Sequence, residues 1–188
     1  MKVVAFNSSP RKNGNTQIML NAVGSELEAA GIAVEHIRIG GELLKGCQAC
    51  GKCAELKRCI FDKDPMNDWI AKMADADGIL LGSPTYFATV NTEMKALIDR
   101  AGFVLVRTGK LRHKVGAPVA VARRGGAIQT YNTLMAFFGI SEMIVPGSIY
   151  WNMGYGLSTG DVQNDAEGLE TMRVLGRNMA LVMKKLKA

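Results

Sequence analysis

The chain has 188 residues, of which 48% are hydrophobic, 21% charged and 6% aromatic. This length suits a single domain, residues 1–188, and the apolar fraction is too high for a disordered chain. No apolar run approaches the roughly 20 residues of a membrane-spanning helix, and the first residues lack the apolar stretch of a signal peptide. We therefore expect a cytoplasmic protein that does not contact a membrane.

Two compositional features bear on function: a basic charge balance and clustered cysteines. Lysine and arginine outnumber aspartate and glutamate by 23 to 17, which gives a net charge of +6. The four cysteines all lie between residues 47 and 59. In a reducing compartment, clustered cysteines are more often metal ligands or redox groups than structural disulfides. A secreted, disulfide-stabilised module is therefore disfavoured.

The first part of the chain predicts two strands around a helix, followed by a long loop. Residues 2–7 form a short β-branched apolar run that ends in turn residues, as buried strands do. Residues 15–31 carry a helical apolar stripe and end in glycine. Residues 33–39 alternate apolar and polar side chains, which indicates an edge strand. A loop rich in glycine and cysteine follows at about residues 40–63.

The middle of the chain alternates helices with buried strands. Helices are predicted at residues 65–76, 91–104 and 127–138, because each segment carries apolar side chains on one face. The short apolar runs at residues 78–82 and 117–122 predict strands. The first of these runs is the more apolar and is expected in the middle of the sheet.

The end of the chain predicts a fifth strand at residues 143–149, interrupted by Pro146 and Gly147, and a last helix at residues 166–186. Strands separated by helices pair in parallel, because each return crossover needs a helix. The expected fold is α/β: an open, doubly wound sheet of five parallel strands with helices on both faces, of the flavodoxin-like type. Ligands of such sheets bind beyond the carboxyl ends of the strands, near a topological switch point.

The loop at residues 7–16 follows the first strand and is expected to cradle a phosphate. Its hydrogen-bonding and basic side chains are Ser8, Ser9, Arg11, Lys12, Asn13, Asn15 and Thr16. Gly14 permits a sharp turn, and the helix that starts directly afterwards brings unpaired N–H groups and a positive dipole end. The loop lacks the signatures of nucleoside triphosphatases and of dinucleotide-binding folds. The alternative is a plain polar turn with an asparagine N-cap.

The loop at residues 83–91 places two aromatic side chains directly after the predicted central strand. Tyr86 and Phe87 are suited to lie against a flat ring, while the backbone around Pro84 and Thr85 hydrogen-bonds the polar edge of that ring. The alternative is a pair of aromatic residues that caps the end of the sheet.

The loop at residues 122–127 combines two arginines with two glycines. Gly125 and Gly126 permit close approach of the backbone to a ligand, and Arg123 and Arg124 are suited to stabilise a developing anion. The alternative is a basic surface turn. Because the sheet brings all three loops to one crevice, a phosphate site beside a flat-ring site predicts a mononucleotide, and the aromatic and cationic surroundings favour a flavin.

Four motifs, in chain order, carry a family resemblance: SSPRKNGNT, GCQACGKCAELKRC, SPTYF and RRGG. Over essentially its whole length the chain resembles the flavodoxin-like NADPH-dependent FMN reductase superfamily and, within it, the iron–sulfur flavoproteins. The resemblance implies bound FMN, whose ring carries the chemistry, and a homodimer or homotetramer with the flavin near a subunit interface. No catalytic side chain is expected, and His36 and His113 are interpreted as surface residues.

The resemblance also implies which residues surround the FMN. They are Ser9, Arg11, Gly14, Asn15 and Thr16 at the phosphate, Pro84, Thr85, Tyr86 and Phe87 at the isoalloxazine ring, and Arg124, Gly125 and Gly126 on its pyrimidine side. Trp151, expected after the last strand, would cover a neighbouring subunit's flavin or else belong to the core. The residues expected to supply an apolar interface are Met135, Phe137, Phe138 and Trp151.

The four cysteines, Cys47, Cys50, Cys53 and Cys59, have the spacing C-x2-C-x2-C-x5-C. The first three resemble the bacterial ferredoxin run, although the last gap is longer and Ile60 stands where proline would follow. Iron–sulfur flavoproteins hold one [4Fe–4S] cluster with compact runs of this kind, so the resemblance implies such a cluster. Free thiols or a labile disulfide are the alternatives, and zinc is less natural because its cysteine sites split into two separated pairs.

Together these features predict an FMN-dependent oxidoreductase. It would transfer electrons from NAD(P)H or reduced ferredoxin to a small acceptor, such as a quinone or an oxygen species. A basic surface would steer such anionic donors. The alternative is a non-catalytic flavin or iron–sulfur electron carrier or redox sensor. Nucleic-acid binding is not expected, because the basic residues are scattered and form no stripe with interleaved aromatic residues.

Overall fold

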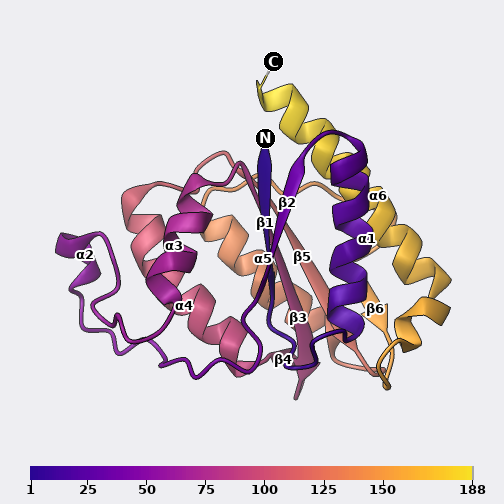
Figure 1. The fold of residues 1–188 in the computed structure, drawn as a ribbon, viewed down its shortest axis with the longest axis horizontal. Helices are drawn as coiled ribbons and strands as arrows, with labels where there is room; N and C mark the ends of the chain where they lie inside the picture. Colours follow the sequence, from indigo (N-terminus) through magenta and orange to yellow (C-terminus); the bar gives the residue numbers. More distant parts are fainter. Residues whose placement is uncertain (188) are drawn as a thin grey trace.

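A parallel sheet organises the protein, which a computed structural model describes over residues 1–187. The strand order is β2-β1-β3-β5-β6, so the winding direction of the chain reverses between β1 and β3 (Figure 1). The parallel strands are β1 (Lys2–Asn7), β2 (Ala33–Arg38), β3 (Gly78–Tyr86), β5 (Val115–Ala122) and β6 (Met153–Tyr155). This arrangement confirms the predicted α/β, flavodoxin-like fold.

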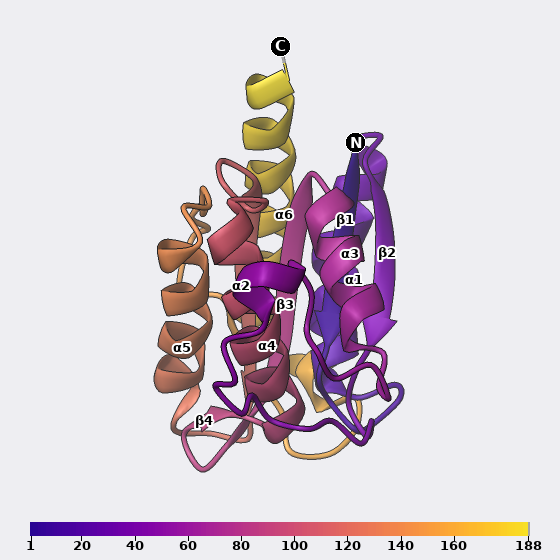
Figure 2. The same ribbon diagram turned by 90° about the vertical axis from the view of Figure 1, so that its left-hand side faces the viewer.

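Helices cover both faces of the sheet, as Figures 1 and 2 show from two sides. One face is covered by α1 (Asn15–Ala29) and α6 (Ala166–Lys187). The other face is covered by α3 (Met66–Asp75), α4 (Thr92–Thr108) and α5 (Ala127–Ile140). Three short elements complete the fold: α2 (Cys53–Leu56), β4 (Thr89–Val90) and a 3-10 helix, η1 (Asp161–Asn164).

Alternate side chains of the central strands point into two halves of the core. Val3 and Ala5 of β1 pack with α1 and α6, whereas Val4 and Phe6 pack with the helices of the opposite face. The ring of Phe6 meets Trp69 of α3 edge to face, with ring centroids 6.5 Å apart. Burial on both faces explains why the strands are near-continuous apolar runs in the sequence.

The predicted position of the fifth strand, residues 143–149, is wrong. Within that segment Ile144 makes only an isolated bridge with Val115, and the strand that completes the sheet is β6, beside residues 120–122 of β5. Pro146 lacks the N–H that a paired strand needs, which interrupts the segment. As a result Trp151 precedes the last strand and does not follow it.

Two other elements are longer than predicted. β3 continues past Gly82 to Tyr86, because residues 83 and 84 still pair with β5 and residues 85 and 86 pair antiparallel with β4. α4 continues to Thr108 and ends at Gly109, whose φ of 64° is the left-handed conformation that glycine favours after a helix. Over residues 1–187, no helix combines the length and the apolar character that crossing a membrane requires.

Candidate functional site

The carboxyl ends of the strands converge at the switch point between β1 and β3, at the lower edge of the sheet in Figure 1. The backbone N–H of Ser8 donates to the carbonyl of Gly82 at 3.0 Å. The side-chain amide of Asn91, at the start of α4, donates to the carbonyl of Ser8 at 2.6 Å. All three residues are buried, so the first two predicted loops are joined by buried hydrogen bonds.

The loop after β1 has a compact conformation that leads directly into α1. Asn7 Oδ1 accepts a hydrogen bond from the backbone N–H of Ser9 at 2.9 Å, and Ser9 Oγ accepts one from the N–H of Arg11 at 3.3 Å. The N-cap of α1 is Gly14, and no side chain caps the helix there. The predicted alternative of an asparagine N-cap is therefore wrong, and the start of α1 offers its N–H groups to an anion.

A fourth segment, which the sequence analysis missed, lies against this loop. Residues 157–160 follow β6, and Asn15 contacts them twice: its amide donates to the carbonyl of Ser158 at 2.9 Å, and its Oδ1 accepts from the N–H of Gly160 at 2.8 Å. Arg11 Nη1 donates to the carbonyl of Leu157 at 2.9 Å. Arg11 and Asn15, which the sequence predicts at a phosphate, therefore bind the loop after β6. The signal for it was the run of turn residues at 158–161.

The aromatic loop forms a tight hairpin at the end of β3. Phe87 and Ala88 have positive φ angles of 48° and 60°, which is the backbone of a two-residue hairpin turn, and Phe87 is fully exposed. Tyr86 is 48% exposed, so neither ring belongs to the core. A bulky side chain rarely adopts such a backbone conformation, and this strain concentrates at functional sites.

The arginine–glycine turn before α5 lies against the base of this hairpin. A Cβ atom on Gly126, whose φ is 85°, would lie 3.0 Å from the Cα of Ala88, so only glycine fits there. Thr130 Oγ1 and Thr85 Oγ1 are 3.0 Å apart and connect α5 to the hairpin. Arg124 and Gly125, which directly precede Gly126 in this turn, are exposed. The structure therefore brings the second and third predicted loops together.

Two of the residues expected at a subunit interface are core residues. Phe138 is fully buried and Phe137 is 5% exposed, because both contribute to the core beneath α5; Phe137 also lines the floor of a groove beside this helix. Trp151 is 50% exposed and meets Tyr150 edge to face, which rules out the alternative of a core tryptophan. Met135 is half-buried.

The four cysteines line one cavity of about 100 Å³, which side chains of α4 also line. Cys47 and Cys50 are exposed, Cys53 and Cys59 are half-buried, and all four are free thiols. Their segment includes α2, which projects beyond α3 and α4 on the left of Figure 1. Among residues 1–187, no three acidic, histidine or cysteine side chains are arranged to hold a single metal ion. A cubane differs in that each of four thiolates binds its own iron, and the four thiols that it would need are gathered around this one cavity.

Two side chains that the sequence analysis missed hold the last cysteine of the loop. Asn67 Oδ1 accepts a hydrogen bond from the N–H of Cys59 at 2.9 Å, and its amide donates to the carbonyl of Cys59 at 3.0 Å. Arg100 of α4 donates from Nε to Cys59 Sγ at 3.3 Å. An arginine between Leu97 and Ala101 on the inward face of α4 was the signal for this contact.

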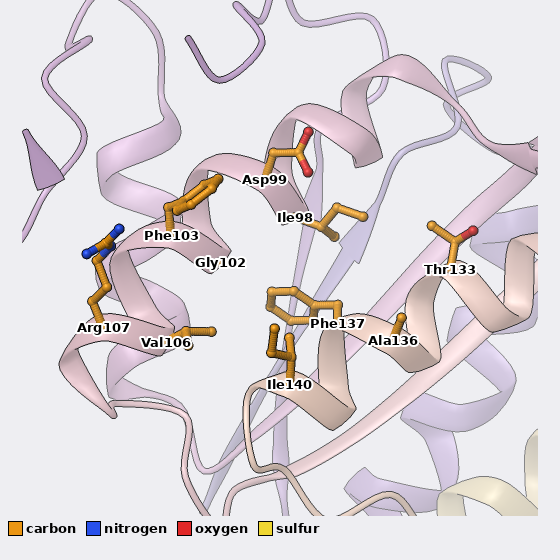
Figure 3. A pocket seen from close by; sticks show the side chains of 10 residues that line it. All are labelled: Ile98, Asp99, Gly102, Phe103, Val106, Arg107, Thr133, Ala136, Phe137 and Ile140. Carbon is orange, nitrogen blue, oxygen red and sulfur yellow. The ribbon is translucent and has the colours of Figure 1, made fainter. Parts of the chain in front are cut away.

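An open apolar groove of about 700 Å³ runs between α4 and α5, as Figure 3 shows. Ile98 and Phe103 of α4 face Phe137 and Ile140 of α5 across it (Figure 3). Phe103 and Arg107 line both this groove and the cysteine cavity, so the two hollows adjoin.

Comparison with known proteins identifies the family. The family model described as NADPH-dependent FMN reductase matches residues 1–158. An iron–sulfur flavoprotein of Methanocaldococcus jannaschii is 39% identical over 195 residues, which cover 100% of both chains, and one of Methanosarcina thermophila is 29% identical over 187 residues, covering 98% of this chain and 96% of the relative. The crystal structure of a WrbA-like flavodoxin from Agrobacterium tumefaciens superposes with a TM-score of 0.68 at 21% identity, covering 98% of this chain and 97% of the other.

These matches agree with the flavodoxin-like sheet and with the convergence of the loops at its switch point, where proteins of this fold bind FMN. The chain therefore belongs to the NADPH-dependent FMN reductase family, and it is a flavin-dependent oxidoreductase.

Proposed function

We propose that this oxidoreductase takes electrons from NAD(P)H or reduced ferredoxin, delivers them to a small acceptor such as a quinone or an oxygen species, and holds a [4Fe–4S] cluster as a second redox centre. The observation that carries the proposal is that all four cysteines line a single cavity. The iron–sulfur names of the relatives support it.

The FMN phosphate is proposed to bind at the loop before α1. Ser9 and Thr16 supply hydroxyl groups there, and Gly14 leaves the first turn of α1 uncapped by a side chain. Arg11 adds positive charge beside the site while it holds the carbonyl of Leu157. Asn15 acts indirectly in this proposal, because both ends of its amide bind residues 158–160.

The isoalloxazine ring is proposed to lie at the hairpin after β3. Pro84 and Thr85 form the base of this site, and Tyr86 and Phe87 present exposed rings that would exclude water from one side of the flavin. The turn of Arg124, Gly125 and Gly126 lies against the hairpin and would face the pyrimidine side of the ring. Bound flavin supplies the hydride and single-electron chemistry, while these residues orient it.

The cluster is proposed to be held by Cys47, Cys50, Cys53 and Cys59. Basic side chains surround these residues in the sequence and would offset the negative charge of a thiolate-ligated cluster; they are Lys45, Lys52, Lys57 and Arg58. The same charges would favour docking of an acidic ferredoxin or of the anionic nicotinamide cofactor. The reducing cytoplasm is the compartment in which free thiols of this kind persist.

The groove between α4 and α5 supports a homodimer or homotetramer. Its exposed side chains include Ile140, at 70%, and Phe103, at 48%, so both helices present a large apolar side chain to the solvent at this groove. We propose that a second copy covers this face, so that the cysteine cavity lies at the edge of the interface. Light scattering of wild type and of Ile140→Glu tests this: the variant should dissociate, and an unchanged mass would contradict the proposed face.

The decisive experiment is anaerobic purification followed by absorbance spectroscopy and by iron and sulfide analysis. We expect flavin bands together with about four iron atoms per chain. NADPH and reduced ferredoxin are then added separately to the loaded protein, and a quinone is added last. Bleaching of the flavin by either donor, followed by repeated turnover with quinone, supports the enzyme. Flavin that neither donor reduces would favour the carrier or sensor alternative.

A further inference from the structure

Arg100 is a buried charge beneath the cysteine loop, with its side chain 1% exposed. We propose that Arg100 is the positioning residue of this loop and that its hydrogen bond to Cys59 Sγ raises the reduction potential of the cluster. The inference rests on the cluster proposed above, and it deepens that proposal by naming the residue outside the cysteines on which the site depends.

Every nitrogen of the Arg100 guanidinium donates a hydrogen bond to the cysteine loop or to Asp64, which follows it. Nε donates to Cys59 Sγ at 3.3 Å. Nη1 donates to the carbonyl of Lys45 at 3.0 Å and to the carboxylate of Asp64 at 2.5 Å. Nη2 donates to the carbonyl of Phe61 at 3.1 Å and to the second carboxylate oxygen of Asp64 at 3.0 Å. All five N–H donors of an arginine can thus be accounted for.

These contacts hold both ends of the cysteine loop. Lys45 precedes the first cysteine, and Phe61 and Asp64 follow the last, so one side chain closes the segment that contains all four thiols. Holding the ends of a flexible loop offsets part of the conformational entropy that would otherwise keep its thiols apart. A lysine has a single nitrogen and cannot make this set of contacts.

The guanidinium remains charged in this setting. An arginine side chain stays protonated in proteins, and the two carboxylate oxygens of Asp64 accept hydrogen bonds from Nη1 and Nη2. The same pair lowers the pKa of Asp64, although burial by itself would raise it. The sulfur of Cys59 therefore accepts a hydrogen bond from a positively charged group.

Such a donor has a predictable electrochemical effect. Reduction adds negative charge to a thiolate-ligated cluster, and a charged N–H group on a ligand sulfur stabilises that added charge. The reduction potential is therefore higher with Arg100 than without it. Cys53 differs, because its thiol donates to the carbonyl of Phe103 at 3.9 Å and, among residues 1–187, no cationic side chain donates to its sulfur.

The test compares Arg100→Lys and Arg100→Met with Arg107→Gln. Arg107 lies about two helical turns further along α4 and lines the same cavity, but its guanidinium lies over the ring of Phe103, 6.0 Å from its centroid. The potential of the anaerobically loaded cluster is measured by redox titration. Both Arg100 variants should shift it downward, and Arg107→Gln should shift it less. An equal shift in Arg107→Gln, or none in the Arg100 variants, would overturn the proposal.

Hydrogen exchange of the cluster-free protein supplies a second readout. Amides of residues 45–64 should exchange faster in both Arg100 variants than in wild type or Arg107→Gln, while amides of β1 stay protected. Unchanged exchange in this segment would contradict the positioning role. If Arg100→Met does not fold, Arg100→Lys carries both measurements. Wild-type protein that binds no iron refutes the cluster, whereas iron-loaded wild type with unaffected Arg100 variants refutes only this inference.

Discussion

The flavin crevice and the cysteine loop are built in different ways. The crevice is formed where strands end, and buried backbone hydrogen bonds such as that from Ser8 to Gly82 connect its loops. The cysteine loop, by contrast, is mostly exposed, has only the short helix α2, and is held mainly by side chains of Asn67 and Arg100. The first site is shaped by the sheet, and the second by a few side-chain contacts.

This difference predicts how substitutions at each site affect the stability of the protein. Parallel strands deliver their carboxyl ends to one edge, so the crevice forms whenever the sheet forms. A long loop is stabilised little by the sheet. The entropy that it loses on ordering must therefore be offset by its own contacts or by a bound cluster. Changes at the crevice should therefore alter global stability, whereas changes at the cysteine loop should remain local.

The largest effect is expected from Gly40→Ala, because Gly40, just after β2, donates its N–H to the carbonyl of Asn7 at 3.2 Å and so lies at the crevice end of β1. A Cβ atom on Gly40 would lie 2.1 Å from the backbone carbon and oxygen of Ser9, so the loop after β1 must move. We expect a loss of about 3 kcal/mol in the free energy of unfolding, as overpacking causes, together with at least a tenfold loss of FMN affinity. Urea unfolding and fluorescence titration with FMN measure the two effects.

Gly46→Ala is the matched control inside the cysteine segment. Among the described residues 1–187, apart from Gly46 and its two chain neighbours, no heavy atom lies within 4 Å of a Cβ built on Gly46, so alanine fits there. The free energy of unfolding and the FMN affinity of this variant should both equal those of wild type. A loss equal to that of Gly40→Ala would show that the two regions are not independent.

Asn91→Ala should have the next largest effect. The change removes the amide that donates to the carbonyl of Ser8 at 2.6 Å and leaves that carbonyl buried. An unsatisfied buried acceptor costs about 2 kcal/mol, which should appear as a lower urea midpoint and weaker FMN binding. A midpoint equal to that of wild type would contradict the importance of this connection for the crevice.

Asn67→Ala is the corresponding change at the cysteine loop. It removes the hydrogen bonds to the backbone N–H and carbonyl of Cys59, but Asn67 is only half-buried, so water replaces part of the loss. We expect the local stability of the cysteine loop to fall by about 1 kcal/mol, which should appear mainly as faster exchange of its amides. The affinity for FMN should not change. Loss of FMN binding would break the proposed separation of the two regions.

The smallest effect is expected from acidification of the Arg100–Asp64 pair. Burial raises the pKa of Asp64, but the hydrogen bond and charge of Arg100 outweigh it and hold the pKa below the ordinary value of 3.8. Because the folded-state pKa is the lower one, the pair stabilises the loop fully above about pH 4 and loses this effect as the pH falls through the folded-state value.

Hydrogen exchange checks this prediction in wild type and in Asp64→Asn. As the pH falls below about 4, the loop amides of wild type should lose protection relative to those of β1. The asparagine variant lacks the titrating group, so its ratio of loop to β1 protection should stay constant. Parallel pH profiles in the two proteins would rule out the pair as the source of the effect.

Much of the fold follows from local patterns. The apolar runs at residues 2–7 and 78–82 are each separated from the next by a helical segment, and that alternation is sufficient for a parallel sheet. The fifth strand was misplaced because residues 143–149 are apolar while β6 has only three residues. Strand propensity depends on what the strand packs against, and a short edge strand carries little local signal.

The sequence by itself determined the alternation of strands and helices, the three polar and aromatic loops and the clustering of the four cysteines, because each depends on neighbouring residues. Only the tertiary structure decided that Asn15 holds residues 158–160, 143 positions from Ser158, and that Arg100 reaches Cys59, 41 positions away. Contacts of this kind arise when the sheet brings distant segments together, and no local pattern encodes which partner a buried polar side chain will meet.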